Sequence, residues 1–503
     1  MSKRTNKKPE SLVVDHDHIT PAQKLNTPTS QLNTNLNVQH TKSPQPKTPY
    51  FYRSRESLLE SELEQENPQE KQEEEPLKDA KECNRHRYDG FFNLCVVMLI
   101  GSCTVLCVDN YLNKGLLVDL DLLKCMTADA YRSYLLAPVI LGYAVFIFFL
   151  SQVNMRFIYQ GQITDEKGRI IRASQKTPSR TKDTIYLLCN VLYLSGLFSV
   201  FYTVVHLIFA WRVSILISFV VSLCLMVVTF KMHSYYVYIG RSFTPNAVQV
   251  PTDEHINHST LVTLNEFTYF MVAPTMCFFR YYPRTDSIRV GYLVKQALSI
   301  IACLSIMYVM CMQFLDPVLK MTSFSEADVR TAYLVLKVSL PWFIIWLLGS
   351  YAFFHCWLNI VAELTMFADR LWYKDWWNAP TFDEFWRMWN IPTHHFLLRH
   401  VYFASLRYKW SKSVALWLTF FLSAFVHELC MSIVFRTLRY YFFLAMMLQI
   451  PFVSLAERFK NQNKRLGNCL MWMSLFTGQP LMVLLYFKDW YSQEMAMCEV
   501  RYN

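Results

Sequence analysis

Long apolar runs follow one another through most of this chain, and they constrain its fold more than any other feature. The hydrocarbon core of a bilayer is about 30 Å thick, so a helix needs about 20 apolar residues to cross it. Backbone that faces lipid must satisfy its own hydrogen bonds, which favours helices. We therefore predict an all-α fold, a polytopic membrane bundle of about nine transmembrane helices. The predicted spans, of which the eighth is short, are Phe91–Val108, Tyr134–Val153, Thr184–Trp211, Val213–Phe230, Gly291–Leu315, Tyr333–Leu358, Val414–Met431, Tyr440–Val453 and Leu470–Phe487.

Residues 1–88 form a polar N-terminal segment that contrasts with the membrane domain predicted over residues 89–503. Such a composition, rich in Pro, Gln, Asn, Ser and charge, buries too little apolar surface to fold alone. No apolar signal-peptide core follows Met1, so we expect a mostly disordered tail on the cytosolic side. Tyr50–Leu63 stands out, because its leucines could form a short amphipathic helix. That helix would be either transient or a docking segment for a partner subunit.

The composition argues against several classes of function. Charged residues make up 17% of the chain, against about 25% in soluble proteins. The net charge of +10 marks loops that face anionic lipid, and we expect no binding to nucleic acid. The 14 cysteines show no C-x-x-C pair and no zinc spacing. We expect them to pack as small apolar side chains in a reducing compartment, and we expect no metal site.

Two polar segments interrupt the predicted bundle. Asp165–Lys182 is basic, which predicts a cytosolic loop. Phe367–Ser413 carries six tryptophans among charges and histidines. Indole rings favour the membrane–water boundary, so this segment is predicted to lie in the interface, either as an aromatic belt alone or with a binding site.

A His-Glu pair stands inside the apolar run Val414–Met431. Ionisable groups at membrane depth are costly, and they usually face the interior of a bundle or a water-filled cavity. His427 is therefore either a satisfied structural histidine or a functional one, and it shares a helix face with Ser423. Glu428 points about 100° away, which favours a structural partner over a joint acid–base pair.

A histidine at this place suits acyl transfer to an alcohol. Attack on a thioester requires a base for the hydroxyl proton, and imidazole takes up and releases protons near neutral pH. A thiolate leaves readily, whereas the thioester oxygen needs a hydrogen-bond donor such as an Asn or Gln amide. We expect no acyl-enzyme intermediate, because no activated Ser or Cys is apparent.

A second group of polar residues precedes this pair. In Trp389–His394 (WNIPTH), Pro392 should end any helix, and Asn390 is either a helix cap or an amide donor. Tyr373–Asn378 (YKDWWN) mixes charge with aromatic rings. It either binds a polar headgroup or nucleotide, or anchors the chain at the interface.

Other catalytic signatures are absent from the sequence. It contains no G-x-S-x-G, no Walker A motif, no H-E-x-x-H, and no His followed at the fifth position by Asp. Two alternatives to an enzyme stay open, a transporter or channel and a catalytically silent scaffold. Broken helices in symmetric halves would support a transporter, and none is apparent.

Three motifs resemble those of the membrane-bound O-acyltransferase superfamily, in its diacylglycerol and sterol acyltransferase branch, and the likeness extends over most of the chain. Tyr373–Asn378 is similar to the end of the family motif F-Y-x-[DE]-W-W-N, with Trp372 where the family usually has Phe. Trp389–His394 resembles W-N-x-P-V-H, with Thr393 in place of Val. Ser423–Glu428 resembles S-A-x-x-H-E.

Shorter segments distinguish the diacylglycerol acyltransferases of this branch from its sterol acyltransferases. Those similar to diacylglycerol acyltransferases outnumber those similar to sterol acyltransferases, so we expect diacylglycerol as the acceptor and keep sterol esterification as the alternative. The first kind comprises Gly90–Leu99, Ala273–Thr275, Tyr282–Arg284, Ala362–Leu364, Gln449–Pro451 and Gly478–Pro480, and the second comprises Lys231–Tyr235 and Tyr52–Leu59.

The resemblance implies roles for individual residues. In the family, the histidine of the H-E pair is the general base and the asparagine of W-N-x-P is its catalytic companion, which correspond here to His427 and Asn390. Gln449 and Gln479 would line the reaction chamber near the acyl thioester. The other residues implied in substrate binding are Tyr373, Trp377, Asn378, Trp389, His394, Ser423 and Glu428.

The resemblance also implies substrates, partners and location. Acyl-CoA would enter from the cytosolic side as a co-substrate, with no cofactor, and diacylglycerol or another lipid alcohol would arrive from the bilayer. We expect a multi-pass protein of the endoplasmic reticulum membrane that forms a homodimer or homotetramer, with its N-terminal segment exchanged between protomers.

Overall fold

The structure is a computed structural model that describes residues 101, 104–105, 107–117, 131–159, 163–164, 170–171, 180–241, 262–321, 329–460 and 464–490. These residues all belong to one compact unit, Gln72–Asn503. The polar tail, with its segment Tyr50–Leu63, lies outside the described residues, as do most of the first predicted span, Phe91–Val108, and most of the loop Asp165–Lys182.

Besides loops, the described chain consists of helices and one antiparallel hairpin, β1 (Ile163–Thr164) and β2 (Ile170–Ile171). Seven helical stretches in it are long and apolar enough to cross a membrane, and they match seven of the predicted spans. The predicted span Tyr440–Val453 matches the shorter apolar stretch Tyr441–Pro451. The all-α membrane bundle is therefore confirmed. The seven stretches are Tyr134–Asn154, Thr184–Ala210, Ile215–Gly240, Val290–Val318, Tyr333–Leu364, Lys412–Phe435 and Lys464–Phe487.

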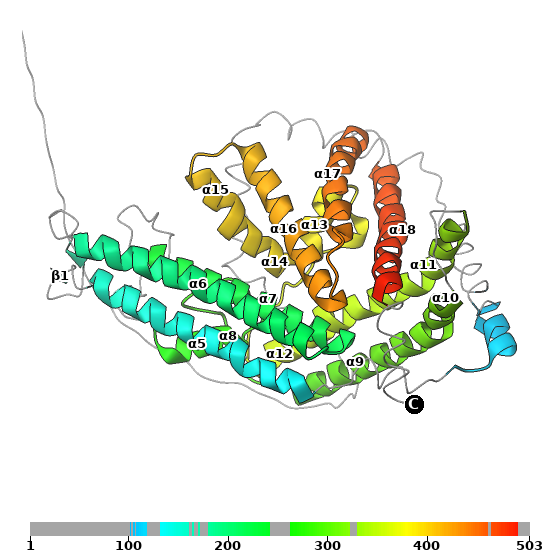
Figure 1. Cartoon of the computed structure of the whole chain (residues 1–503), viewed down its shortest axis with the longest axis horizontal. Coiled ribbons are helices and arrows are strands. Elements are labelled where there is room, and N and C mark those ends of the chain that lie inside the picture. The colour runs from blue at the N-terminus through cyan, green and yellow to red at the C-terminus, as the bar shows by residue number, and fades with distance from the viewer. Residues whose placement is uncertain are drawn as a thin grey trace, which may run out of the picture. The chain divides into compact units, whose positions relative to one another are not determined.

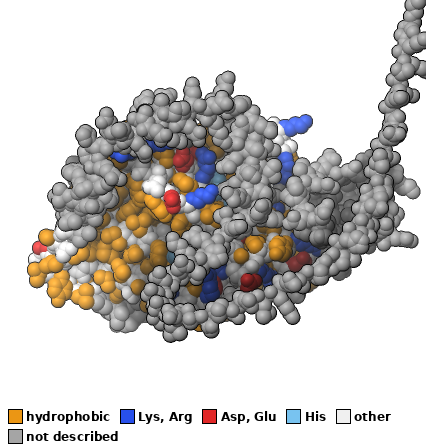
Figure 2. All heavy atoms as spheres, turned by 180° about the vertical axis from the view of Figure 1, so that it is seen from behind, with side chains coloured by type: hydrophobic (Ala, Val, Ile, Leu, Met, Phe, Trp, Pro, Cys, Tyr) orange, Lys and Arg blue, Asp and Glu red, His pale blue; other side chains and the backbone are white. Residues whose placement is uncertain are grey.

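Three of these helices form a first group, in which they lie side by side (Figure 1). Each buries one face in a shared core, where Leu136, Val204 and Leu225 are fully buried. The opposite faces expose large apolar side chains such as Phe149 and Phe198, and in a bilayer these faces contact lipid. Figure 2, the view from behind, shows a further continuous apolar area at the end of the bundle opposite to the hairpin β1–β2. The helices are α5 (Tyr131–Tyr159), α6 (Arg180–Ala210) and α7 (Ile215–Arg241).

The next two long spans, Val290–Val318 and Tyr333–Leu364, form a second group, and π-helical turns interrupt both. Helix α9 continues through η1 into α10, and α11 continues through η2 into α12. A π-helical turn inserts an extra residue into the helix and frequently marks a functional site. The bounds are α8 (Leu264–Val272), α9 (Val290–Met310), η1 (Cys311–Leu315), α10 (Asp316–Met321), α11 (Val329–Ser350), η2 (Tyr351–Trp357) and α12 (Leu358–Leu364).

The tryptophan-rich segment folds into short helices. They precede α16, α17 and α18, which form a third group. Helix α16 contacts both α7 and α17, and α17 contacts α18, so the third group is joined to the first (Figure 1). The bounds are η3 (Trp376–Asn378), α13 (Phe382–Trp389), α14 (Ile391–Leu397), η4 (Leu398–Tyr402), α15 (Phe403–Arg407), α16 (Lys412–Phe435), α17 (Tyr441–Lys460) and α18 (Lys464–Trp490).

A buried lysine fixes the C-terminal end of α8. The Lys231 ammonium donates to the carbonyl oxygens of Phe270, Met271 and Ala273 at 2.7–2.8 Å. The last carbonyls of a helix lack partners within the helix, and a cation there also meets the negative end of the helix dipole. Lys231 therefore attaches the end of α8 to α7.

A buried carboxylate on α12 connects the loop before α9 to the loop after α12. Glu363 is fully buried and accepts from the backbone and guanidinium of Arg289 at 2.7–3.0 Å and from Arg370 at 2.5 Å. Arg289 precedes α9, and Arg370 lies in the loop that leads to the predicted site. The predicted motif Ala362–Leu364 therefore has a structural function in this fold.

Candidate active site

His427 lies within α16, and the backbone of that helix fixes the position of its ring proton. Imidazole Nδ1 is 2.7 Å from the carbonyl oxygen of Ser423. A carbonyl oxygen only accepts, so Nδ1 carries the proton and the neutral ring has an unprotonated Nε2. Nε2 has no hydrogen-bond partner among the described residues, and the side chain keeps exposed surface. The ring therefore presents an open acceptor atom within a predicted span.

Trp386 joins α13 to two of the spans. Its indole Nε1–H donates to Oε1 of Gln449 on α17, at 2.7 Å. Its ring lies edge-on to the imidazole of His427 on α16, with ring centroids 6.3 Å apart and planes at 69°. The structure therefore brings His427 and Gln449 into contact with one indole. The sequence did not single out Trp386 as a site residue, because nothing local distinguishes it from the other tryptophans of its segment.

Glu428, the neighbour of His427, uses its carboxylate to accept hydrogen bonds from five groups of the protein. Its carboxylate accepts from the backbone N–H groups of Tyr440, Phe442 and Phe443 at 2.8–3.2 Å. It also accepts from the hydroxyls of Ser432, at 3.1 Å, and Tyr486. These contacts cap the start of α17 and reach α18, as expected for a structural partner of the site.

Asn390 stands between α13 and α14, and its side chain caps the second helix. Its Oδ1 accepts from the backbone N–H of Thr393 at 3.2 Å. α13 ends at Trp389, before Pro392, and Pro392 lies in the first turn of α14. The cap occupies the amide oxygen, and the amide NH2 has no hydrogen-bond partner among the described residues. The two alternatives for Asn390, cap and donor, are therefore compatible.

Tyr373 forms a hydrogen bond that the sequence did not indicate. Its hydroxyl is 2.9 Å from Nδ1 of His355, which lies in the π-helical turn η2. The local signal was available, since His355 is a histidine inside a predicted span, as His427 is. Trp377 packs edge-on to Tyr373, with ring centroids 6.4 Å apart, and both Trp377 and Asn378 are exposed.

Trp389 belongs to an aromatic core that supports this segment. Its ring stacks on Trp346 with centroids 4.7 Å apart and planes at 11°. It also meets Trp376 and Phe354 edge-on, at 4.9 Å and 5.4 Å. These contacts fix the end of α13 against α11 and η2, next to Asn390.

His394 lies in α14 among positive charges. Burial, the adjacent His395 and the cations Arg387 and Lys374 lower its pKa to about 4, so the ring is neutral at physiological pH. No group of three His, Cys, Asp or Glu side chains suited to a metal ion occurs in the described part of the chain.

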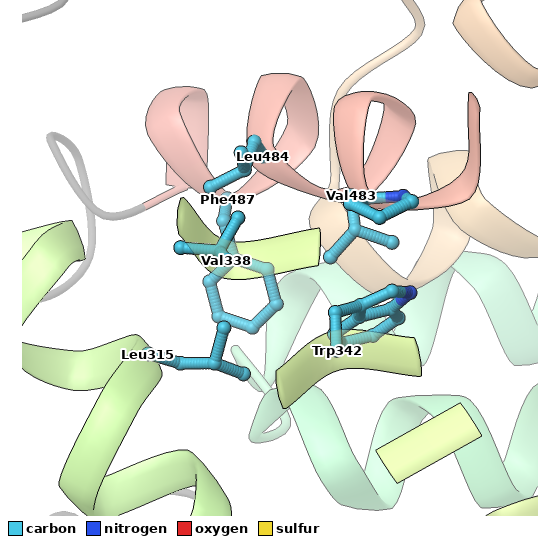
Figure 3. Close-up of a pocket in the computed structure, with 7 residues that line it drawn as sticks. Leu315, Val338, Trp342, Val483, Leu484 and Phe487 are labelled. Atoms are coloured by element: carbon cyan, nitrogen blue, oxygen red, sulfur yellow. The ribbon is translucent and has the colours of Figure 1, made fainter. Parts of the chain in front are cut away.

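Gln479 lies on α18. It makes no hydrogen bond to another described residue, and the residue after it, Pro480, lines a small apolar cavity of about 30 Å³ between η1, α11 and α18 (Figure 3). The structure therefore groups His427 with Gln449 but shows no direct contact from either to Gln479. The other residues that line the cavity are Leu315, Val338, Trp342, Val483, Leu484 and Phe487.

A family model described as the membrane-bound O-acyltransferase family matches residues 187–488, which is more than half of the chain and contains every predicted site residue. The chain belongs to the membrane-bound O-acyltransferase family. Membership of this family confirms the resemblance noted in the sequence motifs. It favours an enzyme over the transporter and scaffold alternatives.

Several relatives of this membrane-bound O-acyltransferase are named diacylglycerol O-acyltransferases. "Diacylglycerol O-acyltransferase 1C" of Glycine max is 30% identical over 415 residues, 80% of this chain and 76% of the relative. "Diacylglycerol O-acyltransferase 1" of Arabidopsis thaliana is 31% identical over 422 residues, 82% of this chain and 75% of the relative. "Diacylglycerol O-acyltransferase 1-2" of Oryza sativa subsp. japonica is 40% identical over 243 residues, which are 46% of this chain and half of the relative.

Proposed function

We propose that this enzyme transfers the acyl group of acyl-CoA to the free hydroxyl of diacylglycerol, which releases triacylglycerol and CoA. All three relatives are named diacylglycerol O-acyltransferases, which favours diacylglycerol over a sterol as the acceptor. The observation that carries the chemistry is the hydrogen bond from Nδ1 of His427 to the carbonyl of Ser423, which leaves Nε2 as the acceptor atom of a neutral ring.

His427 acts as the general base in this proposal. Its Nε2 takes the hydroxyl proton while the acceptor oxygen attacks the thioester carbon. The C–S bond breaks, CoA leaves as a thiolate, and the thiolate takes the proton from the imidazolium. The hydrogen bond from Nδ1 to the carbonyl of Ser423 holds the ring through both proton transfers.

Two amides are available to stabilise the oxygen that becomes negative during attack. Asn390 and Gln449 each use the amide oxygen as an acceptor, from Thr393 and Trp386 respectively. Each therefore has an NH2 group left to donate, and donors placed at a developing oxyanion lower the barrier strongly. We assign these two amides to the thioester oxygen, and we assign Gln479 and Ser423 to the lining of the chamber.

We assign the entrance for acyl-CoA to the segment that follows α12. Trp377 and Asn378 are exposed there, and Tyr373 lies beside them. The cations Lys374 and Arg387, which lower the pKa of neutral His394, would attract the phosphates of CoA.

We further propose that the enzyme resides in the endoplasmic reticulum membrane as a homodimer or homotetramer, with its N-terminus in the cytosol. A tag at Met1 in sealed microsomes tests the orientation. We expect protease to remove the tag without detergent, and protection of the tag would contradict a cytosolic N-terminus.

Product formation by purified, detergent-solubilised enzyme tests the proposed reaction. Radiolabelled acyl-CoA is offered with diacylglycerol or with a sterol, for wild type and for His427→Ala. We expect triacylglycerol from wild type, and a loss of at least about a hundredfold in His427→Ala. The matched control is His206→Ala, because His206 also lies in a span, on α6, and is also exposed, but among the described residues it only stacks on Tyr202.

Each outcome decides a separate part of the proposal. Steryl ester as the only product would overturn the diacylglycerol assignment and keep the mechanism. Full activity in His427→Ala would overturn the base. No ester from wild type shown to be folded would overturn the proposed reaction.

A further inference from the structure

Trp386 contacts two groups of the proposed active site and takes no part in the reaction proposed above. We propose that Trp386 is a positioning residue, whose indole N–H turns the amide of Gln449 so that its NH2 group faces the reacting acyl group beside His427. This inference rests on the proposed function and deepens it.

The orientation of the amide follows from the chemistry of the two partners. An indole N–H only donates, so the atom of Gln449 that lies 2.7 Å from it must be the amide oxygen. The two polar atoms of an amide point in different directions from one carbon, so Nε2 is directed away from the indole. Nε2 has no hydrogen-bond partner among the described residues. Two N–H donors are therefore held open on a half-buried side chain.

The same indole also locates these donors relative to the base. Trp386 comes from α13, whereas His427 and Gln449 come from α16 and α17, and its ring touches both. α13 is itself fixed, because Thr381 caps its first turn and Phe385 is buried beside Trp386 with ring centroids 5.0 Å apart. An element outside the two spans therefore sets the distance between base and donors.

Without the indole N–H, nothing in the described contacts distinguishes the two orientations of the Gln449 amide. A flipped amide would place an oxygen opposite the negative thioester oxygen, which opposes attack. The loss of one donor at an oxyanion typically costs about a hundredfold or more in rate. We expect Trp386→Phe, which keeps an aromatic ring, to lower kcat about 10- to 100-fold and to change KM for acyl-CoA less than about threefold.

A double-mutant cycle with Gln449→Ala tests whether Trp386 acts through Gln449. We expect the double variant to be no slower than Gln449→Ala alone, since the amide that Trp386 positions is then missing. A purely structural role of Trp386 would instead multiply the two losses. Wild-type kcat in Trp386→Phe, or multiplied losses in the cycle, would overturn the inference.

Gln449→Glu provides a test that leaves Trp386 intact. The carboxylate still accepts from the indole, but it presents an oxygen where the amide presents NH2. We expect a folded and almost inactive enzyme, and wild-type activity would overturn the inference even if Trp386→Phe lowers the yield of protein.

Trp342→Phe is the matched control, because in the described part of the chain the buried Trp342 Nε1–H has no hydrogen-bond partner. It should retain wild-type kcat. The comparison between wild type and His427→Ala decides the proposed function separately. Active wild type with unaffected Trp386→Phe would overturn this inference alone, whereas inactive wild type would overturn both.

Discussion

At the residue scale, Trp372 replaces the Phe that is usual in the family motif, and within the described part of the chain its indole nitrogen is unpaired. Trp372 is buried and stacks on Phe367, with ring centroids 6.1 Å apart. Its Nε1–H has no hydrogen-bond partner among the described residues. A buried donor without a partner costs about 1–3 kcal/mol, which offsets what the larger ring gains by packing.

Trp372→Phe should therefore leave both stability and activity close to wild type. The lost ring volume destabilises the protein, whereas removal of the unpaired N–H stabilises it. We expect a thermal midpoint within about 3 °C of wild type, measured in detergent by the loss of folded protein on heating. A fall of more than about 6 °C would show that packing of the indole outweighs its unpaired donor.

His427 and Glu428 are adjacent in sequence and have separate functions in the fold. His427 keeps an open acceptor atom, whereas every described contact of Glu428 is to a protein donor. Helical geometry explains the division, because neighbouring side chains on a helix point about 100° apart.

At the element scale, the start of α17 depends on the carboxylate of Glu428. The first N–H groups of a helix have no partners within it, and a negative charge there also meets the positive end of the helix dipole. The same carboxylate contacts Tyr486 on α18. The packing of α16, α17 and α18 therefore depends on one side chain, next to the proposed base.

Glu428→Gln should destabilise the protein more than His427→Ala does. The amide keeps only one oxygen, so its NH2 group would face either the N–H of Tyr440 or those of Phe442 and Phe443, and at least one backbone N–H loses its partner. We expect a loss of about 3 kcal/mol or more, seen as a lower thermal midpoint than that of His427→Ala. Equal midpoints for the two variants would contradict the structural function of Glu428.

At the scale of the whole molecule, the apolar surface of the seven predicted spans identifies the part that faces lipid. Phe198 is 73% exposed within the span Thr184–Ala210. Tyr408 is 78% exposed in the turn between α15 and α16, next to Lys409 and Trp410. We expect hydrocarbon around the first side chain and the membrane–water interface around the second.

Phe198→Arg should impair insertion into the membrane. An arginine at the centre of a span costs about 2.5–3.5 kcal/mol on the insertion scale. We expect less carbonate-resistant protein in membranes from Phe198→Arg cells. Tyr408→Lys is the control and should insert as wild type does, because an interfacial lysine reaches water. Equal insertion of the two variants would contradict the assignment of α6 to the lipid.

The sequence alone predicted the seven spans found in the described part of the chain, and it singled out His427 and Asn390 as candidates. Apolar length is a local property of the chain, and a polar residue inside an apolar run is visible without knowledge of its neighbours. Helical periodicity also separated Glu428 from His427.

Only the tertiary structure decided which polar groups meet. The contact of Trp386 with Gln449 and His427 joins α13 to the consecutive helices α16 and α17, and all the tryptophans of the segment have the same local signal. The amide orientation of Gln449 was likewise decided by its partner on another helix, whereas the ring proton of His427 is fixed by Ser423 of its own helix. Hydrogen bonds depend on distance and direction between side chains, and these are fixed only when the spans pack together.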